Sequence, residues 1–116
     1  MEVIVLSIHK EMKQSLNINS FIKMKENNDI ITCLTAYDYT SAKILDNAGI
    51  DLILIGDSLG MVMNGYNSTI PVTIDEIIYH TKAVKRAVMH AFVVADMPFG
   101  SYHIDEKSAV KNAVRL

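Results

Sequence analysis

Two aspartates stand directly after apolar runs of the chain, where they could share a ligand. Asp57 follows the run 52–55 and Gly56, and Asp96 follows the run 91–95. If both runs are parallel strands, their carboxyl ends meet at one edge of the sheet, where such folds bind ligands. Two carboxylates at that edge repel each other unless a cation or a proton lies between them. Mg²⁺ suits oxygen donors of this kind, because it takes one or two protein carboxylates together with substrate and water.

The same residues also have ordinary structural interpretations. Asp57 and Asp96 could instead cap the loops or helices that follow them. Ser58 could hydrogen-bond an anionic ligand, although an Asp-Ser pair after a strand is more typical of a turn. Tyr37 and Asp38 follow an earlier apolar run; they could line the same edge, and we expect Asp38 to cap a helix. His80 lies on a predicted helix face, and we expect it to be a packed or interface histidine.

Other kinds of chemistry find little support in the sequence. A zinc site needs clustered histidines and cysteines, whereas the only cysteine stands alone and the histidines are scattered. These residues are Cys33, His9, His80, His90 and His103. No GxGxxG or GxxxxGK[ST] pattern supports nucleotide binding. The net charge of −2 gives no electrostatic basis for binding nucleic acid or an anionic membrane.

Length and composition indicate one packed domain and allow a reducing compartment. The 116 residues are 50% hydrophobic and 21% charged, which excludes a disordered chain. Cys33 has no second cysteine to pair with. The apolar run near the N-terminus is short and follows Glu2 rather than a basic residue, so we expect no secretory signal. No run approaches the roughly 18 apolar residues of a membrane helix, and we expect a cytoplasmic protein.

The elements that must position the two aspartates alternate along the chain. Short apolar runs predict strands over 30–34, 52–55 and 91–95, each buried on both faces. Capping and helical spacing predict a short helix over 20–25 after Asn19, then helices after Asp38 or Thr40, after Thr73 and after Asp105. Gly49 should end the second of these helices, and Thr73 with Glu76 forms a capping box. We expect a long loop over 57–72.

The resulting order β-α-β-α-β-α predicts an α/β fold with right-handed crossovers and a parallel sheet. Periodicity alone does not separate a doubly wound sheet from a barrel. A complete (β/α)₈ barrel needs about 250 residues, or 200 at the low end, so this chain could supply fewer than half of its units.

Several segments together resemble the ketopantoate hydroxymethyltransferase family. The similarity runs from about residue 18 to residue 116 in the order and spacing of that family. The segments that carry it are LTAYD (34–38), AGID (48–51), GDSLGMV (56–62), GY (65–66), PVT (71–73), HTKAV (80–84) and ADMPFGSY (95–102). GDSLGMV together with DMPFGSY is the most specific part of the pattern.

The resemblance implies a partial (β/α)₈ TIM barrel, with about the first three βα units after a short N-terminal helix. Residues 1–17 would be an extension, and residues 18–116 the N-terminal part of a catalytic domain. It implies that Asp57 and Asp96 hold Mg²⁺, and that Ser58 and both aspartates contact the substrate.

The reaction implied belongs to pantothenate biosynthesis. A one-carbon unit passes from 5,10-methylenetetrahydrofolate to C3 of 3-methyl-2-oxobutanoate, giving 2-dehydropantoate. Mg²⁺ stabilises the enolate formed when a base removes the C3 proton. The partners are therefore small molecules, and the family implies a homo-oligomer, commonly a decamer.

The family pattern also implies that this chain is truncated. A substrate-binding lysine, a third acidic metal contact and the glutamate general base are expected beyond Leu116. Glu106 and Lys111 fall in a helical pattern and do not replace them, so we assign no catalytic residue within the chain. Two alternatives stay open. One is an inactive remnant or fragment, and the other is a different Mg²⁺-dependent 2-oxo-acid lyase or transferase barrel.

Overall fold

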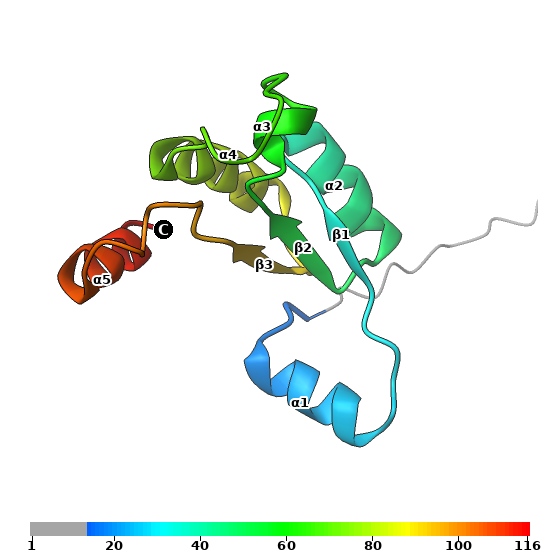
Figure 1. Ribbon diagram of the computed structural model, residues 1–116. Coiled ribbons are helices and arrows are strands. Elements are labelled where there is room, and N and C mark those ends of the chain that lie inside the picture. Colours follow the sequence, from blue (N-terminus) through cyan, green and yellow to red (C-terminus); the bar gives the residue numbers. More distant parts are fainter. Residues whose placement is uncertain (1–13) are drawn as a thin grey trace, which may run out of the picture.

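The fold is a three-stranded parallel sheet with helices between its strands (Figure 1). The computed structural model describes residues 14–116. The strand order β1-β2-β3 follows the chain, so the predicted alternation and parallel pairing are confirmed; a closed barrel stays a prediction. The elements are α1 (Ile18–Glu26), β1 (Cys33–Thr35), α2 (Tyr39–Ala48), β2 (Leu52–Ile55), α3 (Leu59–Val62), α4 (Ile74–Ala87), β3 (Phe92–Ala95) and α5 (Glu106–Arg115).

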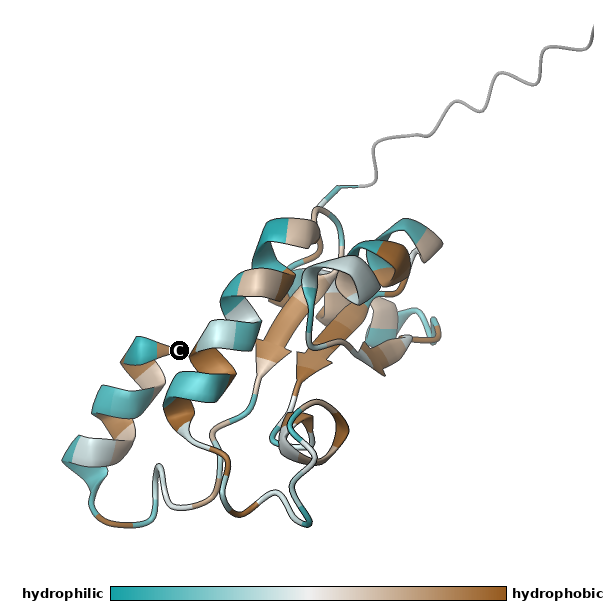
Figure 2. Ribbon diagram, turned by 90° about the horizontal axis from the view of Figure 1, so that it is seen from above, coloured by the Kyte–Doolittle hydropathy of each residue, from teal (hydrophilic) through white to brown (hydrophobic). Residues whose placement is uncertain are grey.

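The core lies between the sheet and one layer of helices. Ile53 and Ile55 of β2 are fully buried, and they pack with residues of α2 and α4 such as Ala42, Ile77 and Val84. The strands are the most apolar ribbons of the molecule (Figure 2). Residues of β2 that alternate with the buried pair are only half-buried. The expectation that the strands are buried on both faces is therefore wrong for the described residues, because helices α2 and α4 cover only one face.

The first strand is shorter and later than the sequence predicts. We expected residues 30–34, whereas β1 pairs with β2 only over Cys33–Thr35. Its partner β2 begins at Leu52, which lies opposite Cys33, so no residue of β2 remains to pair with Ile30. Ile30 is accordingly 84% exposed. Pairing with the neighbour, rather than the apolar run itself, sets where the strand starts.

The cap of the first helix also differs from the prediction. Asn17, not Asn19, caps α1. Its side chain accepts a hydrogen bond from the Ser20 backbone, and the Ser20 hydroxyl accepts one from the Asn17 backbone. Reciprocal bonding of this kind satisfies two backbone donors at once and outweighs a single cap. Asn19 therefore lies inside the helix.

The other predicted helix ends are confirmed. Asp38 caps α2 by accepting from the Ser41 backbone at 2.9 Å, and Gly49 ends that helix with φ 87°. Thr73 and Glu76 form the predicted capping box of α4. Asp105 caps α5 in the same way as Asp38 caps α2. None of the helices described over residues 14–116 is long and apolar enough to cross a membrane.

The segment 57–72 is not a continuous loop. It contains α3, whose Leu59 is fully buried in the core. A Cβ on Gly60 would collide with Val72, so close chain packing depends on that glycine. The end of the segment is tied to α4, because Glu76 accepts hydrogen bonds at 2.9 Å from both Asn64 and Tyr66. Burial of Leu59 and these side-chain hydrogen bonds give the segment a defined structure, whereas its composition predicted an irregular loop.

The start of β3 is held by a single carboxylate on α2. Asp46 accepts hydrogen bonds from the backbone of Met89, His90 and Ala91 at 2.7–3.0 Å. Burial by itself raises the pKa of Asp46. The three backbone donors and the nearby His90 outweigh that effect and hold the pKa below its ordinary value of 3.8. The link fixes α2 against the loop that enters β3.

We predict that Asp46→Ala lowers the free energy of unfolding by about 2 kcal/mol at neutral pH, because three backbone donors lose their acceptor. Asp46→Asn should cost less, since it keeps one acceptor oxygen. A depressed pKa stabilises the fold above the unfolded value and loses that effect as pH falls through the folded value. The difference between parent and Asp46→Ala should therefore shrink below about pH 4. Urea unfolding at one fixed protein concentration measures it, and a constant difference down to pH 2 would contradict it.

Part of the predicted N-terminal extension is bonded to the fold. Residues 1–13 of it lie outside the described residues. The Leu16 N–H donates to the His90 carbonyl at 2.9 Å, and His90 Nδ1 lies 3.0 Å from the Gln14 carbonyl. Phe21 on α1 meets Phe92, the first residue of β3, edge to face at 5.6 Å. Helix α1 is thus fastened at the amino ends of the strands, on the side opposite to the two aspartates.

We predict that the purified 116-residue polypeptide self-associates. Strands β1 and β3 each have one unpaired edge within the described sheet, and such edges recruit further strands. Leu34 of β1 is 47% exposed, and Ile31, two residues before the strand, is 40% exposed. Size-exclusion chromatography with light scattering should give a mass well above 12.9 kDa at micromolar concentration. A monomer with a cooperative thermal transition would contradict this expectation.

Candidate metal and anion site

The parallel register of β2 and β3 brings the two predicted aspartates together. Ile55 lies opposite Ala95 at the carboxyl ends of the strands, and the Asp96 N–H donates to the Ile55 carbonyl at 3.1 Å. The chain then turns so that the Asp57 N–H donates to the Asp96 carboxylate, 3.1 Å from one oxygen and 3.3 Å from the other. The first acid thus supplies a backbone donor to the second.

The charges at this edge are not balanced by the protein. Burial is the largest influence that raises the pKa of Asp96. The Asp57 N–H lowers it in part, and the negative charge of Asp57 raises it further. Within the described chain the Asp57 carboxylate has no hydrogen-bond donor and no ion-pair partner. The one ion pair among these residues joins Arg115 and Asp75, on the α5 side of the molecule. A bound cation would relieve the repulsion between the two acids.

Neither aspartate performs the helix-capping role that was the structural alternative. Helix α3 begins after Ser58, which makes no side-chain cap bond. The Asp96 carboxylate bonds across the sheet edge to Asp57 and not to the loop that follows it. By contrast, Asp38 is a cap, and its Ser41 bonds lower its pKa. Asp38 thus caps a helix, whereas Asp57 and Asp96 at the sheet edge do not.

Ser58 lies beside the pair and is bonded to a tyrosine. The Tyr37 hydroxyl is 2.7 Å from Ser58 Oγ, and Tyr37 is buried. The Tyr37 carbonyl accepts a hydrogen bond from His80 Nδ1 at 2.6 Å. His80 is thus a partly buried histidine bonded to the backbone, as expected. The sequence suggested Tyr37 only by its place after the first strand and gave no sign of its contact with Ser58.

Gly56 is a site residue that sequence reasoning missed. A Cβ built on it would stand 3.2 Å from Asp96 Oδ2 and 3.3 Å from Ser58 Oγ. The oxygens of two predicted ligand-binding residues therefore converge over the bare Cα of this glycine. The signal in the sequence was a glycine between an apolar strand and an acid, which we took only as the end of the strand.

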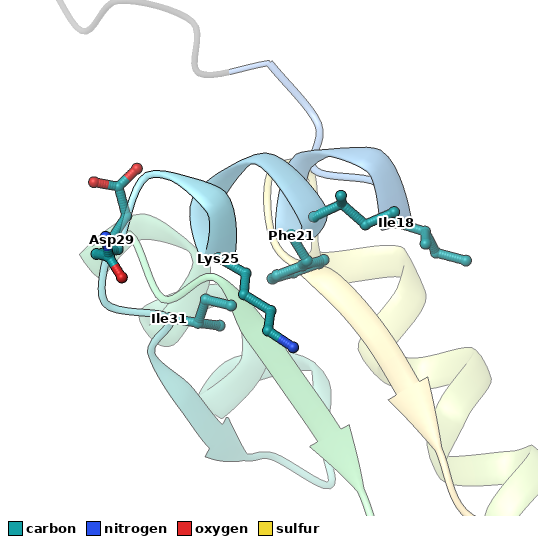
Figure 3. Close-up of a pocket in the computed structure, with 7 residues that line it drawn as sticks. Ile18, Phe21, Lys25, Asp29 and Ile31 are labelled. Carbon is teal, nitrogen blue, oxygen red and sulfur yellow. The ribbon is translucent and has the colours of Figure 1, made fainter.

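A separate pocket of about 560 Å³ lies at the other end of the sheet (Figure 3). It is formed by α1 and the segment that leads to β1. The residues lining it are Ile18, Phe21, Ile22, Lys25, Asn28, Asp29 and Ile31. Because α1 sits at the amino ends of the strands, this pocket is remote from Asp57 and Asp96.

Over residues 14–116 no three His, Cys, Asp or Glu side chains gather as a metal cage. Among the described residues, the side-chain oxygens at the carboxyl edge include those of the two aspartates, Ser58 and Tyr37.

A family model described as ketopantoate hydroxymethyltransferase matches residues 15–116. That range contains both aspartates, Ser58 and every described strand.

The chain belongs to the ketopantoate hydroxymethyltransferase family.

Curated relatives carry the name 3-methyl-2-oxobutanoate hydroxymethyltransferase. The protein of Thermoanaerobacter sp. (strain X514) is 59% identical over 105 residues, which cover 90% of this chain and 38% of that protein. The protein of Koribacter versatilis (strain Ellin345) is 50% identical over 106 residues, covering 91% and 36%. That of Geobacillus sp. (strain WCH70) is 56% identical over 96 residues, covering 83% and 34%. The chain thus spans somewhat more than a third of the length of these transferases and matches their N-terminal part.

We predict that Gly56→Ala disturbs the site without unfolding the protein. Its φ does not lie in the left-handed region, so alanine is compatible with the backbone. The new methyl group would press on Asp96 Oδ2 and Ser58 Oγ and move both by a few tenths of an ångström. Affinity for Mg²⁺, measured by calorimetry, should fall roughly tenfold, as expected when metal ligands are shifted. An unchanged affinity with an unchanged melting temperature would argue against convergence of these oxygens on a ligand.

Proposed function

We propose that this chain forms the metal- and oxo-acid-binding part of a 3-methyl-2-oxobutanoate hydroxymethyltransferase. The reaction is transfer of a hydroxymethyl group from 5,10-methylenetetrahydrofolate to C3 of 3-methyl-2-oxobutanoate, giving 2-dehydropantoate. The observation that carries the proposal is the joining of Asp57 and Asp96 at one sheet edge, with Ser58 alongside and no ion pair from any described cationic side chain to balance them. Family membership supplies the reaction class.

The residues at the edge fit a hard divalent cation. Asp57 offers a carboxylate that accepts no hydrogen bond from residues 14–116. Asp96 offers carboxylate oxygens that accept only from the Asp57 N–H within the same part of the chain. Both are oxygen donors, as Mg²⁺ requires. When bound, Mg²⁺ supplies Lewis-acid polarisation of a 2-oxo acid, which makes the C3 proton easier to remove. The two aspartates would hold the ion, and their unfavourable mutual charge favours its binding.

Ser58 is suited to orient the oxo acid. Its hydroxyl lies on the same side of Gly56 as the Asp96 carboxylate and can donate to an anionic oxygen. Removal of the C3 proton needs a base, and we place that base in the part of the family's length beyond Leu116. Glu106 and Lys111 lie on helix α5, in agreement with their helical pattern, and we give them no role in the reaction.

Two alternatives to this function were left open by the sequence. Another Mg²⁺-dependent 2-oxo-acid barrel would use the same two acids, but the family match favours hydroxymethyl transfer. A non-catalytic remnant remains the alternative for the 116-residue polypeptide by itself. A cytoplasmic location, a homo-oligomer and residues 18–116 as the N-terminal part of a barrel domain stay predictions.

The test uses a chimera that joins this chain to the part of the Thermoanaerobacter sp. protein beyond the match. We predict that the chimera forms 2-dehydropantoate and that the isolated chain does not. Asp57→Asn and Asp96→Asn in the chimera should each weaken Mg²⁺ binding at least about tenfold and lower turnover. Asp29→Asn is the matched control, because Asp29 is exposed and lies at the opposite end of the sheet.

Calorimetry with Mg²⁺ and an assay of 2-dehydropantoate formation give independent readouts. Unchanged Mg²⁺ affinity and turnover in Asp96→Asn would exclude the proposed site. A folded but inactive chimera that still binds Mg²⁺ would favour the remnant interpretation. Activity of the isolated chain would refute the assignment of the base to residues beyond Leu116.

A further inference from the structure

We propose that Tyr37 is a positioning residue that orients the Ser58 hydroxyl toward the carboxylate of the oxo acid. In this arrangement the Tyr37 O–H donates to Ser58 Oγ, and the Ser58 O–H donates to the bound anion. The inference rests on the proposed function, because it takes Ser58 to contact the oxo acid. It adds a residue from the turn after β1 to a site otherwise built from the ends of β2 and β3.

The contact between the two hydroxyls is short and protected. Their oxygens are 2.7 Å apart, and Tyr37 is 8% exposed. Among the described residues neither hydroxyl has another hydrogen-bond partner. A buried tyrosine hydroxyl normally has one partner, and here that partner is a residue of the candidate site.

The direction of the bond follows from the chemistry of the ligand. A hydroxyl carries one hydrogen and two acceptor lone pairs, whereas a carboxylate only accepts. If Ser58 donated to Tyr37, its oxygen would face the anion without a hydrogen and repel it. If Tyr37 donates to Ser58, the serine hydrogen is free for the anion. A row of hydrogen bonds pointing one way also strengthens each member.

The backbone that carries Tyr37 is held from two sides. The Ala36 N–H donates to the Leu54 carbonyl of β2 at 3.2 Å. His80 Nδ1 lies 2.6 Å from the Tyr37 carbonyl, and because a carbonyl only accepts, this histidine nitrogen carries the hydrogen. Helix α4 therefore fixes the Tyr37 peptide while β2 fixes the residue before it. Such support keeps a positioning side chain within a small range of orientations.

The test is a double-mutant cycle in the chimera. Tyr37→Phe keeps the ring and removes only the hydroxyl, and Ser58→Ala removes its partner. We expect each to weaken binding of 3-methyl-2-oxobutanoate roughly tenfold in the presence of Mg²⁺, as for other supporting hydrogen bonds at ligand sites. The double variant should bind no more weakly than Ser58→Ala alone, because Tyr37 acts through Ser58. Affinity is measured by calorimetry, and KM and kcat are measured alongside.

Tyr39→Phe is the matched control. Its hydroxyl has no hydrogen-bond partner among the described residues, and its side chain is exposed, so affinity and KM should stay at the parent values.

Replacement of Tyr37 by p-aminophenylalanine restores a donor at the same place. It should bring affinity back to within about threefold of the parent, and it serves as the measured variant if Tyr37→Phe proves too unstable. A purely structural role for Tyr37 would lower the melting temperature without this recovery.

The outcomes separate this inference from the proposed function. If Ser58→Ala weakens binding but Tyr37→Phe does not, the function stands and the positioning role is overturned. Additive effects of the two substitutions overturn it as well. If Ser58→Ala leaves binding and KM unchanged, the serine contact of the proposed function is itself wrong, and the inference falls with it.

Discussion

The parallel pairing of β2 with β3 is the constraint on which the rest of the structure depends. The two strands run in register from Leu52 opposite Phe92 to Ile55 opposite Ala95. Residues that follow the two strands, 39 positions apart in the chain, therefore emerge side by side at one edge. A shift of one residue would turn Ile53 and Ile55 out of the core and move Asp96 away from the Asp57 N–H. The same register that buries the core thus assembles the site.

The shape of this edge depends on a backbone N–H and on a glycine without a side chain as much as on the side chains of the acids. The Asp57 N–H holds the Asp96 carboxylate, and the Cα of Gly56 leaves room for oxygens from both sides. Strand register places the two acids together, so their mutual repulsion is part of the folded state. Burial and the charge of Asp57 raise the pKa of Asp96. A bound cation or a proton therefore lowers the electrostatic free energy of this site.

Acids elsewhere in the fold have the opposite character. Asp46 on α2, which binds the backbone leading into β3, and Asp38 at the start of α2 accept backbone hydrogen bonds that hold their pKa values below the ordinary range. Glu76 does the same for α4, and its pKa is lowered chiefly by the Thr73 backbone. These carboxylates stabilise the fold as anions. The contrast gives a physical criterion for separating structural acids from the candidate functional pair, because no described residue donates a hydrogen bond to the Asp57 carboxylate.

The sequence by itself determined the alternation of elements, most helix ends and the identity of the two acids. Apolar runs, the Asp38 cap, Gly49 and the Thr73 capping box act over a few residues, so local pattern is enough to predict them. The tertiary structure decided where β1 begins and that α3 forms, because strand pairing and burial of Leu59 are not local preferences. The Asn17 cap of α1 is a local contact with Ser20, and the sequence analysis chose the wrong asparagine there. Only the tertiary structure also brought Tyr37 to Ser58 and left Gly56 between Ser58 and Asp96. Contacts between residues 21 or more positions apart depend on how the strands are registered, which no short stretch of sequence encodes.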